Sequence, residues 1–227
     1  METLKEIIDL LCGADGELRL IIATTLRMSF TSTLIATAIG IPLGALIGLF
    51  AFPGKQLAVR FCNTLMGLPP VLAGLLIFFL LSRSGPLGQY KLIYSVTAMV
   101  LAQILLITPI AAGLTQSIVA AKAPQIRETA RGIGLSGARL LGYVLYECRR
   151  QFGSVLFTGF GRAISEVGAA QIVGGNIQFK TRILTTAIVQ ETNMGHFQKA
   201  LALGLVLLVI SFIITALAQF LLAEQET

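Results

Sequence analysis

Two ionisable residues, Arg162 and Glu166, lie within a long stretch that is otherwise apolar. Their spacing of four residues places them on one face of a helix, where a guanidinium and a carboxylate can pair directly. Pairing lowers the cost of holding either charge in an apolar medium. Two roles are open: a buried structural pair that fixes this helix, or an anion contact made by Arg162. In the second role Glu166 would repel a dianion unless its neighbour neutralises it.

Nothing else in the sequence forms a constellation for catalysis or metal binding. His196 is the sole histidine, and no cysteine or acidic residue stands at a metal-ligand spacing from it. Cys12, Cys62 and Cys148 lie far apart, which indicates neither a disulfide framework nor a metal site. An intramembrane hydrolase that uses serine and histidine is unsupported, because no apolar run holds a nucleophile and a base. We expect no catalytic residue, no metal and no cofactor.

Two nucleotide-binding patterns are also excluded. Gly132, Gly134 and Gly137 spell GxGxxG, but a dinucleotide fingerprint requires a preceding strand and a following helix within a βαβ unit, and that pattern is missing. No GxxxxGK[ST] sequence occurs anywhere in the chain. The chain therefore lacks a P-loop with which to hydrolyse ATP.

The composition indicates that lipid is the main solvent of this chain. Of the 227 residues, 55% are hydrophobic and 12% are charged, and the mean hydropathy is +0.84. A typical globular chain carries about a quarter charged residues. The net charge of +6 does not indicate nucleic-acid binding, because neither an aromatic-interleaved basic stripe nor a polar domain accompanies it. Positive loops that flank a membrane explain it.

Apolar runs predict an all-α integral membrane fold in a single domain over residues 1–227. A helix needs about 20 residues to cross the hydrocarbon core, at about 1.5 Å of rise per residue. The runs predict five spans, at about 20–52, 61–82, 92–121, 151–175 and 199–222. Within the first, Gly40, Gly44 and Gly48 recur every four residues, which favours close packing of a neighbouring helix.

The segment 122–150 sets the expected orientation. It is too polar to span and carries the strongest basic cluster, Lys122, Arg127, Arg131, Arg139, Arg149 and Arg150, against only Glu128 and Glu147. Basic loops lie predominantly on the cytoplasmic side, so this segment is expected there. With five spans, the N-terminus is then extracytoplasmic and the C-terminus cytoplasmic. A cleaved signal peptide is not expected, because the sequence opens with Met1, Glu2 and Asp9 rather than with a basic region.

Segment 122–150 also has the periodicity of an amphipathic helix pair. Pro124 is suited to open a helix, and Gly134 to Gly137 is suited to join the two helices. Apolar residues recur at helical intervals, at Ile126, Ala130, Ile133, Leu140, Leu141 and Val144. On periodicity alone, a surface helix lying on lipid headgroups explains the pattern equally well.

Uncharged polar residues supply further candidates. The turn Gly174, Gly175, Asn176 is expected near the outer face, where exposed backbone amides could meet an anion or a docking protein, although a helix-ending turn explains it equally well. Thr185 is one of several hydroxyl or amide residues in the apolar runs that could hydrogen-bond a passing anion. Hydrogen bonds between helices are the expected use of most of them.

The run Glu128, Thr129, Ala130, three residues and then Gly134, followed by Leu135 and Ser136, resembles the EAA motif of ABC-importer permeases. In that family the motif forms a short cytoplasmic coupling helix that docks on the ATPase subunit. The resemblance implies coupling roles for Arg127, Glu128, Ala130, Arg131, Gly134, Leu135 and Ser136, and a type I permease fold. Thr129 stands where the family usually has Ala. Tyr146 and Glu147 stand where many members have Leu-Pro, which indicates a divergent subfamily.

Three further stretches extend the resemblance over roughly residues 25 to 220. GLPPVLAG at 67–74 and GRAISEVGA at 161–169 resemble oxyanion permeases of the sulfate, molybdate and tungstate group. Together with IVGGN at 172–176 and LTTAIVQET at 184–192, they are most similar to tungstate permeases. From the residues themselves, the candidates for the translocation pathway or the intramembrane pair are Arg162, Glu166, Asn176 and Thr185.

The resemblance also implies partners and a location. Such a permease works in the plasma (inner) membrane as a homodimer with itself, bound to two copies of an ABC ATPase subunit, and receives substrate from an extracytoplasmic binding protein. ATP hydrolysis then belongs to the separate subunit, and this chain is not an enzyme. The alternative is an ion-coupled secondary transporter. That class should show inverted repeats and a coupling acid, yet no repeat is visible and only Glu166 qualifies as the acid.

Overall fold

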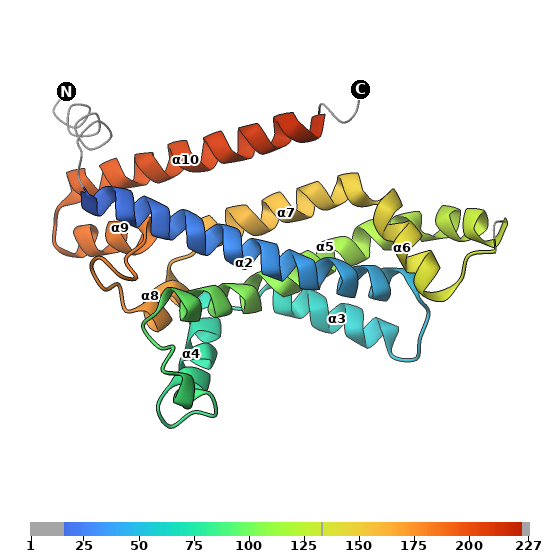
Figure 1. The fold of residues 1–227 in the computed structure, drawn as a ribbon, viewed down its shortest axis with the longest axis horizontal. Helices are drawn as coiled ribbons and strands as arrows, with labels where there is room; N and C mark the ends of the chain where they lie inside the picture. Colours follow the sequence, from blue (N-terminus) through green and yellow to red (C-terminus); the bar gives the residue numbers. More distant parts are fainter. Residues whose placement is uncertain (1–15, 133, 224–227) are drawn as a thin grey trace. The chain divides into compact units, whose positions relative to one another are not determined.

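The computed structural model describes residues 16–132 and 134–223, and every regular element within those ranges is helical (Figure 1). The α-helices are α2 (Gly16–Leu49), α3 (Lys55–Met66), α4 (Pro70–Leu81), α5 (Val96–Gly132), α6 (Gly137–Glu147), α7 (Arg149–Ile164), α8 (Gly168–Gly174), α9 (Leu184–Asn193) and α10 (Phe197–Ala223). A 3₁₀ turn, η1, covers Gly88–Tyr90. The all-α fold predicted from the apolar runs is confirmed.

The described residues group into two compact units. The first unit holds the chain up to Ser32, the segment Pro69–Gln103 and the chain from Gly161 onward. The second unit holds Thr33–Leu68 and Ile104–Phe160. Helices α2, α5 and α7 therefore each contribute one part to each unit.

Among the residues that the structure describes, three helices are long and apolar enough to cross a membrane. They are Gly16–Leu49, Val96–Ala130 and Phe197–Leu217, of 34, 35 and 21 residues. Each exceeds the roughly 20 residues that the hydrocarbon core requires. They match the spans expected at 20–52, 92–121 and 199–222.

The stretch predicted as a span at 61–82 is interrupted by a break between two helices. α3 ends at Met66, and α4 begins only at Pro70. At the end of α3, the Gly67 N–H donates to the Thr64 carbonyl at 3.1 Å and the Leu68 N–H donates to the Leu65 carbonyl at 3.0 Å. Pro69 and Pro70 lack the N–H groups that a continuing helix would use, and Pro70 takes the first helical position, where none is needed. The pair counts as at most one broken span.

The stretch predicted as a span at 151–175 is also divided between two helices. α7 begins at Arg149 and ends at Ile164, and α8 covers only Gly168–Gly174. At the break, the Ser165 hydroxyl donates to the Gly161 carbonyl at 2.8 Å, a local bond that competes with helix continuation. Across the described ranges, at most four spans meet the length and hydropathy required, so not all five expected spans are continuous.

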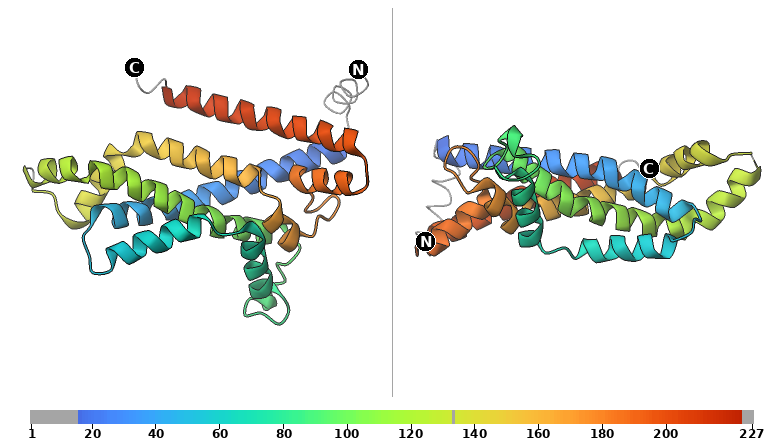
Figure 2. Two further views of the ribbon diagram at one scale, coloured as in Figure 1. Left: turned by 180° about the vertical axis from the view of Figure 1, so that it is seen from behind. Right: turned by 90° about the horizontal axis from the view of Figure 1, so that it is seen from below.

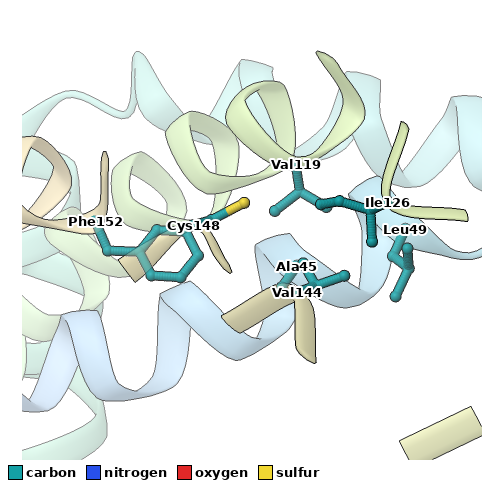
Figure 3. Packing of buried hydrophobic residues seen from close by; sticks show 7 residues of the cluster. All are labelled: Ala45, Leu49, Val119, Ile126, Val144, Cys148 and Phe152. Carbon is teal, nitrogen blue, oxygen red and sulfur yellow. The ribbon is translucent and has the colours of Figure 1, made fainter. Parts of the chain in front are cut away.

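Close contact between α2 and α5 organises the second unit. A Cβ atom on Gly44 would lie 2.3 Å from the Ala112 carbonyl oxygen, and one on Gly40 would lie 2.6 Å from the Ala111 Cβ. No larger residue fits such separations, so the glycine spacing in α2 serves helix packing, as predicted. Beside this contact, seven buried residues of α2, α5, α6 and α7 form an apolar cluster, Ala45, Leu49, Val119, Ile126, Val144, Cys148 and Phe152 (Figure 3).

The first unit contains two helix pairs. α4 packs on α8, where a Cβ on Gly74 would lie 2.8 Å from the Ala169 Cα. α9 lies against the start of α10 (Figure 2). The first turns of α2 join that second pair through a buried cluster, Leu18, Ile21, Leu184, Ala187, Leu203 and Val206. Later residues of α10, among them Phe212 at 73% exposure, have large apolar side chains facing outward, as expected for a lipid-facing helix.

Candidate functional site

The expected helix pair of the coupling segment, residues 122–150, is present with one correction. Pro124 does not open a helix, because α5 runs through it without a break from Val96 to Gly132. The first member of the pair is therefore the end of α5, and the second is α6. A proline inside a helix removes one backbone hydrogen bond. Pro124 is exposed, so its neighbours' free carbonyls can be solvated.

A glycine turn ends α5 as the sequence predicts. Gly134 and Gly137 have φ angles of +70° and +55°, in the left-handed region that favours glycine. The Leu135 N–H donates to the Ala130 carbonyl at 2.8 Å, the long-range bond of a Schellman motif. Ile133 lies outside the described residues. The turn fixes the direction in which the chain leaves α5.

Expected coupling residues divide between a buried and an exposed face of α5. Ala130 is 1% exposed and packs inward, one helical turn after the buried Ile126. Glu128 is exposed, as are Gly134 and Ser136, while Leu135 is half-buried. The Arg131 side chain lies outside the part that the structure describes. The exposed set forms a surface on which a partner can act, and the buried set joins that surface to the core of the second unit.

Arg127 differs from the expectation that it faces a partner. Its guanidinium Nη2 donates to the Leu49 carbonyl at the end of α2. The Lys55 ammonium donates to the preceding Gly48 carbonyl at 3.0 Å. The last carbonyls of a helix lack intrahelical donors and carry partial negative charge, so two cations stabilise this end of α2. Arg127 thus ties the coupling segment to α2.

α6 carries an exposed pair at its C-terminal end. The Arg149 guanidinium carbon lies 4.0 Å from the centroid of the Tyr146 ring, and Arg149 Nη1 donates to the Tyr146 carbonyl at 3.0 Å. Tyr146 is 62% exposed. The neighbouring Cys148 is buried, and burial raises the pKa of its thiol, assisted by Glu147 and opposed by Lys122. Cys148 therefore acts as an apolar core residue.

Arg162 and Glu166 form the ion pair that their spacing predicts. Arg162 Nη1 lies 2.5 Å from Glu166 Oε2, and the Glu166 side chain is 3% exposed. The other carboxylate oxygen accepts the Ala169 N–H at 3.1 Å, at the start of α8. The Thr185 hydroxyl donates to the Glu166 carbonyl at 2.8 Å. Glu166 thereby bridges α7, α8 and α9, while the Arg162 side chain stays 31% exposed.

Asn176 does not join that group. Its Nδ2 donates to Gln190 Oε1 at 2.6 Å, which connects the turn after α8 to α9. The φ of +48° at Asn176 is one that asparagine tolerates better than most residues. Of the four pathway candidates, the structure therefore brings together Arg162, Glu166 and Thr185.

A buried amide connects three helices of the first unit, which is the use expected of most uncharged polar residues in the apolar runs. Gln103, on α5, is 1% exposed. Its Oε1 accepts the Ser32 hydroxyl of α2, and its Nε2 donates to the Ala163 carbonyl of α7 at 2.8 Å. An isolated glutamine in an apolar run was the available signal, but the sequence gives no indication of its partners.

Charged residues at one end of the first unit pair with one another. Glu191 accepts from Lys199 at 2.8 Å and lies 2.9 Å from His196 Nδ1. Desolvation raises the pKa of the Glu191 carboxyl, but the hydrogen bonds from Lys199 and His196 outweigh it, so the pKa is lowered overall. Arg182 pairs with Glu17 at 2.8 Å, joining the turn before α9 to the first turn of α2. His196 thus takes part in a side-chain network around Glu191, which its isolation in the sequence did not indicate.

Comparison with known proteins places these features in a family. Residues 40–224 match the family described as the binding-protein-dependent transport system inner membrane component. The chain belongs to this family. Membership confirms the family expected from the EAA-like run and agrees with the type I permease fold.

Relatives of this inner membrane component cover most of its length. The tungstate uptake system permease protein TupB of Peptoclostridium acidaminophilum is 40% identical over 223 residues, 98% of each chain. A probable anion ABC transporter permease protein of Haloferax volcanii is 36% identical over 202 residues, 87% of each chain. The sulfate transport system permease protein CysW of Escherichia coli (strain K12) is 28% identical over 94% of this chain and 77% of its own.

Proposed function

We propose that this inner membrane component is the permease of an ATP-driven importer for a tetrahedral oxyanion, with tungstate preferred over molybdate and sulfate. The observation that carries the proposal is the 40% identity, over 98% of both chains, to a protein named as a tungstate uptake permease. The lower identity of the sulfate permease supports the order of preference. The chain itself has no P-loop, so its energy comes from a separate ATPase subunit.

The exposed face of the coupling segment is the proposed contact with that ATPase. Glu128 and Ser136 offer polar groups to a partner, and the glycine turn at Gly134 shapes the surface between them. Ala130 is buried beneath it, and Arg127 joins the segment to the end of α2. A displacement of the exposed face therefore moves α5 and α2 together, which is how nucleotide-driven closure reaches the membrane helices.

The proposed assembly contains two copies of this chain, two ATPase subunits and an extracytoplasmic binding protein. The family description supports dependence on a binding protein. Within the described residues, three long helices and the interrupted pairs α3–α4 and α7–α8 are too few to enclose a pathway, which supports a homodimer. With α7 and α8 together forming a fifth, interrupted crossing, a cytoplasmic coupling segment puts the N-terminus on the extracytoplasmic side and the C-terminus in the cytoplasm. Transport then proceeds by alternating access.

Two roles are proposed for the polar group at the α7–α8 break. Glu166, with its carboxylate satisfied by Arg162 and Ala169, fixes three helices. The exposed part of the Arg162 guanidinium supplies positive charge to a passing anion. Glu166 partly neutralises that charge, so the anion is attracted without being held tightly. Thr185 supports this group through its bond to the Glu166 carbonyl, whereas Asn176 connects the turn after α8 to α9.

Uptake into proteoliposomes tests the proposal. The vesicles contain this chain with its ATPase and binding protein, ATP inside, and tungstate, molybdate or sulfate outside. We expect ATP-dependent uptake that favours tungstate. Preference for molybdate or sulfate would refute the substrate, and uptake that proceeds equally without ATP would refute the ATP-driven class. Variants Glu128→Ala and Gly134→Val should lose uptake or ATPase attachment while inserting normally.

A further inference from the structure

The loop from Arg83 to Tyr94, between α4 and α5, surrounds a hollow of about 730 Å³. Its lining includes Arg83, Gln89 and Lys91, together with the ring of Pro86. No acidic residue occurs between Glu17 and Glu128 in the sequence, so none lies in this loop. Within the described part of the chain, neither Arg83 nor Lys91 forms an ion pair. The hollow therefore presents two uncompensated positive charges.

Large apolar and aromatic side chains of the same loop are also exposed. Leu87 is 40% exposed, Tyr90 60% and Tyr94 42%. Tyrosine and arginine are the residue types that most often carry binding energy at protein interfaces, whereas isolated exposed aliphatics are common on any surface. The loop thus combines positive charge with aromatic anchors.

Internal bonds hold the loop in one conformation. The Leu87 N–H donates to the Leu80 carbonyl at 3.0 Å, and the Tyr94 N–H donates to Val173 of α8 at 2.9 Å. A Cβ on Gly85 would lie 2.1 Å from the Phe79 carbonyl oxygen, so the chain closes more tightly than any other residue allows. A loop that is ordered before binding loses little conformational entropy when a partner docks.

The shape favours a protein partner over a small anion. A site for a small anion would converge several buried polar groups on one point. Here Arg83, Gln89 and Lys91 are all exposed, and the hollow has the volume of a drug-sized ligand site. Long cationic side chains around exposed aromatics are instead suited to the acidic surface of another protein, which they attract and orient.

The position of the loop indicates which protein reaches it. The loop ends just before α5 begins at Val96, and α5 ends at Gly132, within the coupling segment. A helix that crosses the membrane has its ends on opposite faces, so the loop is extracytoplasmic if the coupling segment is cytoplasmic. We propose that the Arg83–Tyr94 loop is a docking surface for an acidic, partly apolar face of the binding protein. This inference rests on the proposed function.

A binding titration tests the docking surface. The complete permease–ATPase complex in nanodiscs is titrated with its fluorescently labelled binding protein at low and at high ionic strength. Arg83→Glu/Lys91→Glu should weaken binding about tenfold at low salt, because the two positive charges that attract an acidic partner become negative charges that repel it. High salt should reduce the difference in affinity between the variant and the unaltered complex. Tyr90→Ala should weaken binding of the binding protein about fivefold, because an aromatic contact is lost, and this effect should not depend on salt. The charge-conserving Arg83→Lys/Lys91→Arg is the matched control.

The outcomes separate this inference from the proposed function. Absence of binding to the unaltered complex would refute the binding-protein dependence itself. Equal binding by the unaltered complex and by both loop variants would refute only the docking surface. The complex could also bind tungstate in the absence of the binding protein and lose that binding in Arg83→Glu/Lys91→Glu. This result would show that the hollow binds the anion, and it would overturn the docking surface. Unchanged basal ATP hydrolysis in the variants verifies that the complex is assembled.

Discussion

Replacing Arg127 by methionine should uncouple ATP hydrolysis from transport. Methionine keeps an unbranched side chain that packs beside α2 but cannot donate to the Leu49 carbonyl. A hydrogen bond to a charged group contributes about 1.5–3 kcal/mol, and the charge near the helix end adds about 0.3–1 kcal/mol. A loss of about 2 kcal/mol shifts the equilibrium between a coupling segment that is bonded to α2 and one that is not by about thirtyfold.

The assay measures anion imported per ATP hydrolysed in proteoliposomes. Arg127→Met should keep ATPase attachment, because Glu128 and the exposed face are unchanged, while the import ratio falls several-fold. Arg127→Lys should recover part of it by restoring a donor. Arg139→Met is the control for stability, since Arg139 is an exposed cation of the same segment. If Arg127→Met matches the unaltered protein in both import ratio and unfolding midpoint, the link to α2 has no role in coupling.

Three further predictions concern stability. Gly44→Val should lower the unfolding midpoint by several degrees, because its Cβ would lie 2.3 Å from the Ala112 oxygen and overpacking costs about 1–3 kcal/mol. Gly204→Val is the control, because the space around Gly204 is open, and equal midpoints for the two variants would refute the close approach of α2 and α5. Gln103→Leu should cost about 0.6–1.7 kcal/mol for each lost interhelical bond, measured by denaturant titration in detergent, and an unchanged midpoint would contradict the three-helix link. Because the pKa of Glu191 is lowered in the folded protein, its contribution is complete above the ordinary value of about 4.3 and is lost as pH falls through the folded pKa. The midpoint difference between the unaltered protein and Glu191→Gln should therefore shrink below pH about 4, and a constant difference would contradict the sign.

Long apolar runs predict the three continuous crossing helices well, because length and hydropathy are properties of the sequence alone. They fail where a helix breaks inside the membrane. Pro69 and Pro70 indicate one bend from the sequence, but hydropathy alone does not show that the helix ends there. Pro124, the same residue type, does not break α5. Whether a proline ends a helix depends on how the freed carbonyls are satisfied, and that is decided by tertiary surroundings.

The candidate site shows the same division. The i, i+4 spacing predicts the pair of Arg162 and Glu166, and glycine predicts the turn at Gly134, since both are local. Arg127 and Glu128 are adjacent basic and acidic residues, and nothing local predicts that Arg127 turns toward α2. The partners of Gln103 lie 71 and 60 positions away in the sequence. Contacts at such separations are determined by how the helices pack.

The pairing of α4 with α8 has a consequence for synthesis. α4 has 12 residues, a length of about 18 Å, and so cannot cross a hydrocarbon core of about 30 Å alone. Its partner begins at Gly168, which the ribosome adds 87 positions after Leu81. At roughly 5–20 residues per second, α4 waits several seconds at the translocon before the surface under Gly74 exists. During that interval, the face of α4 at Gly74 lacks the helix that covers it in the folded protein.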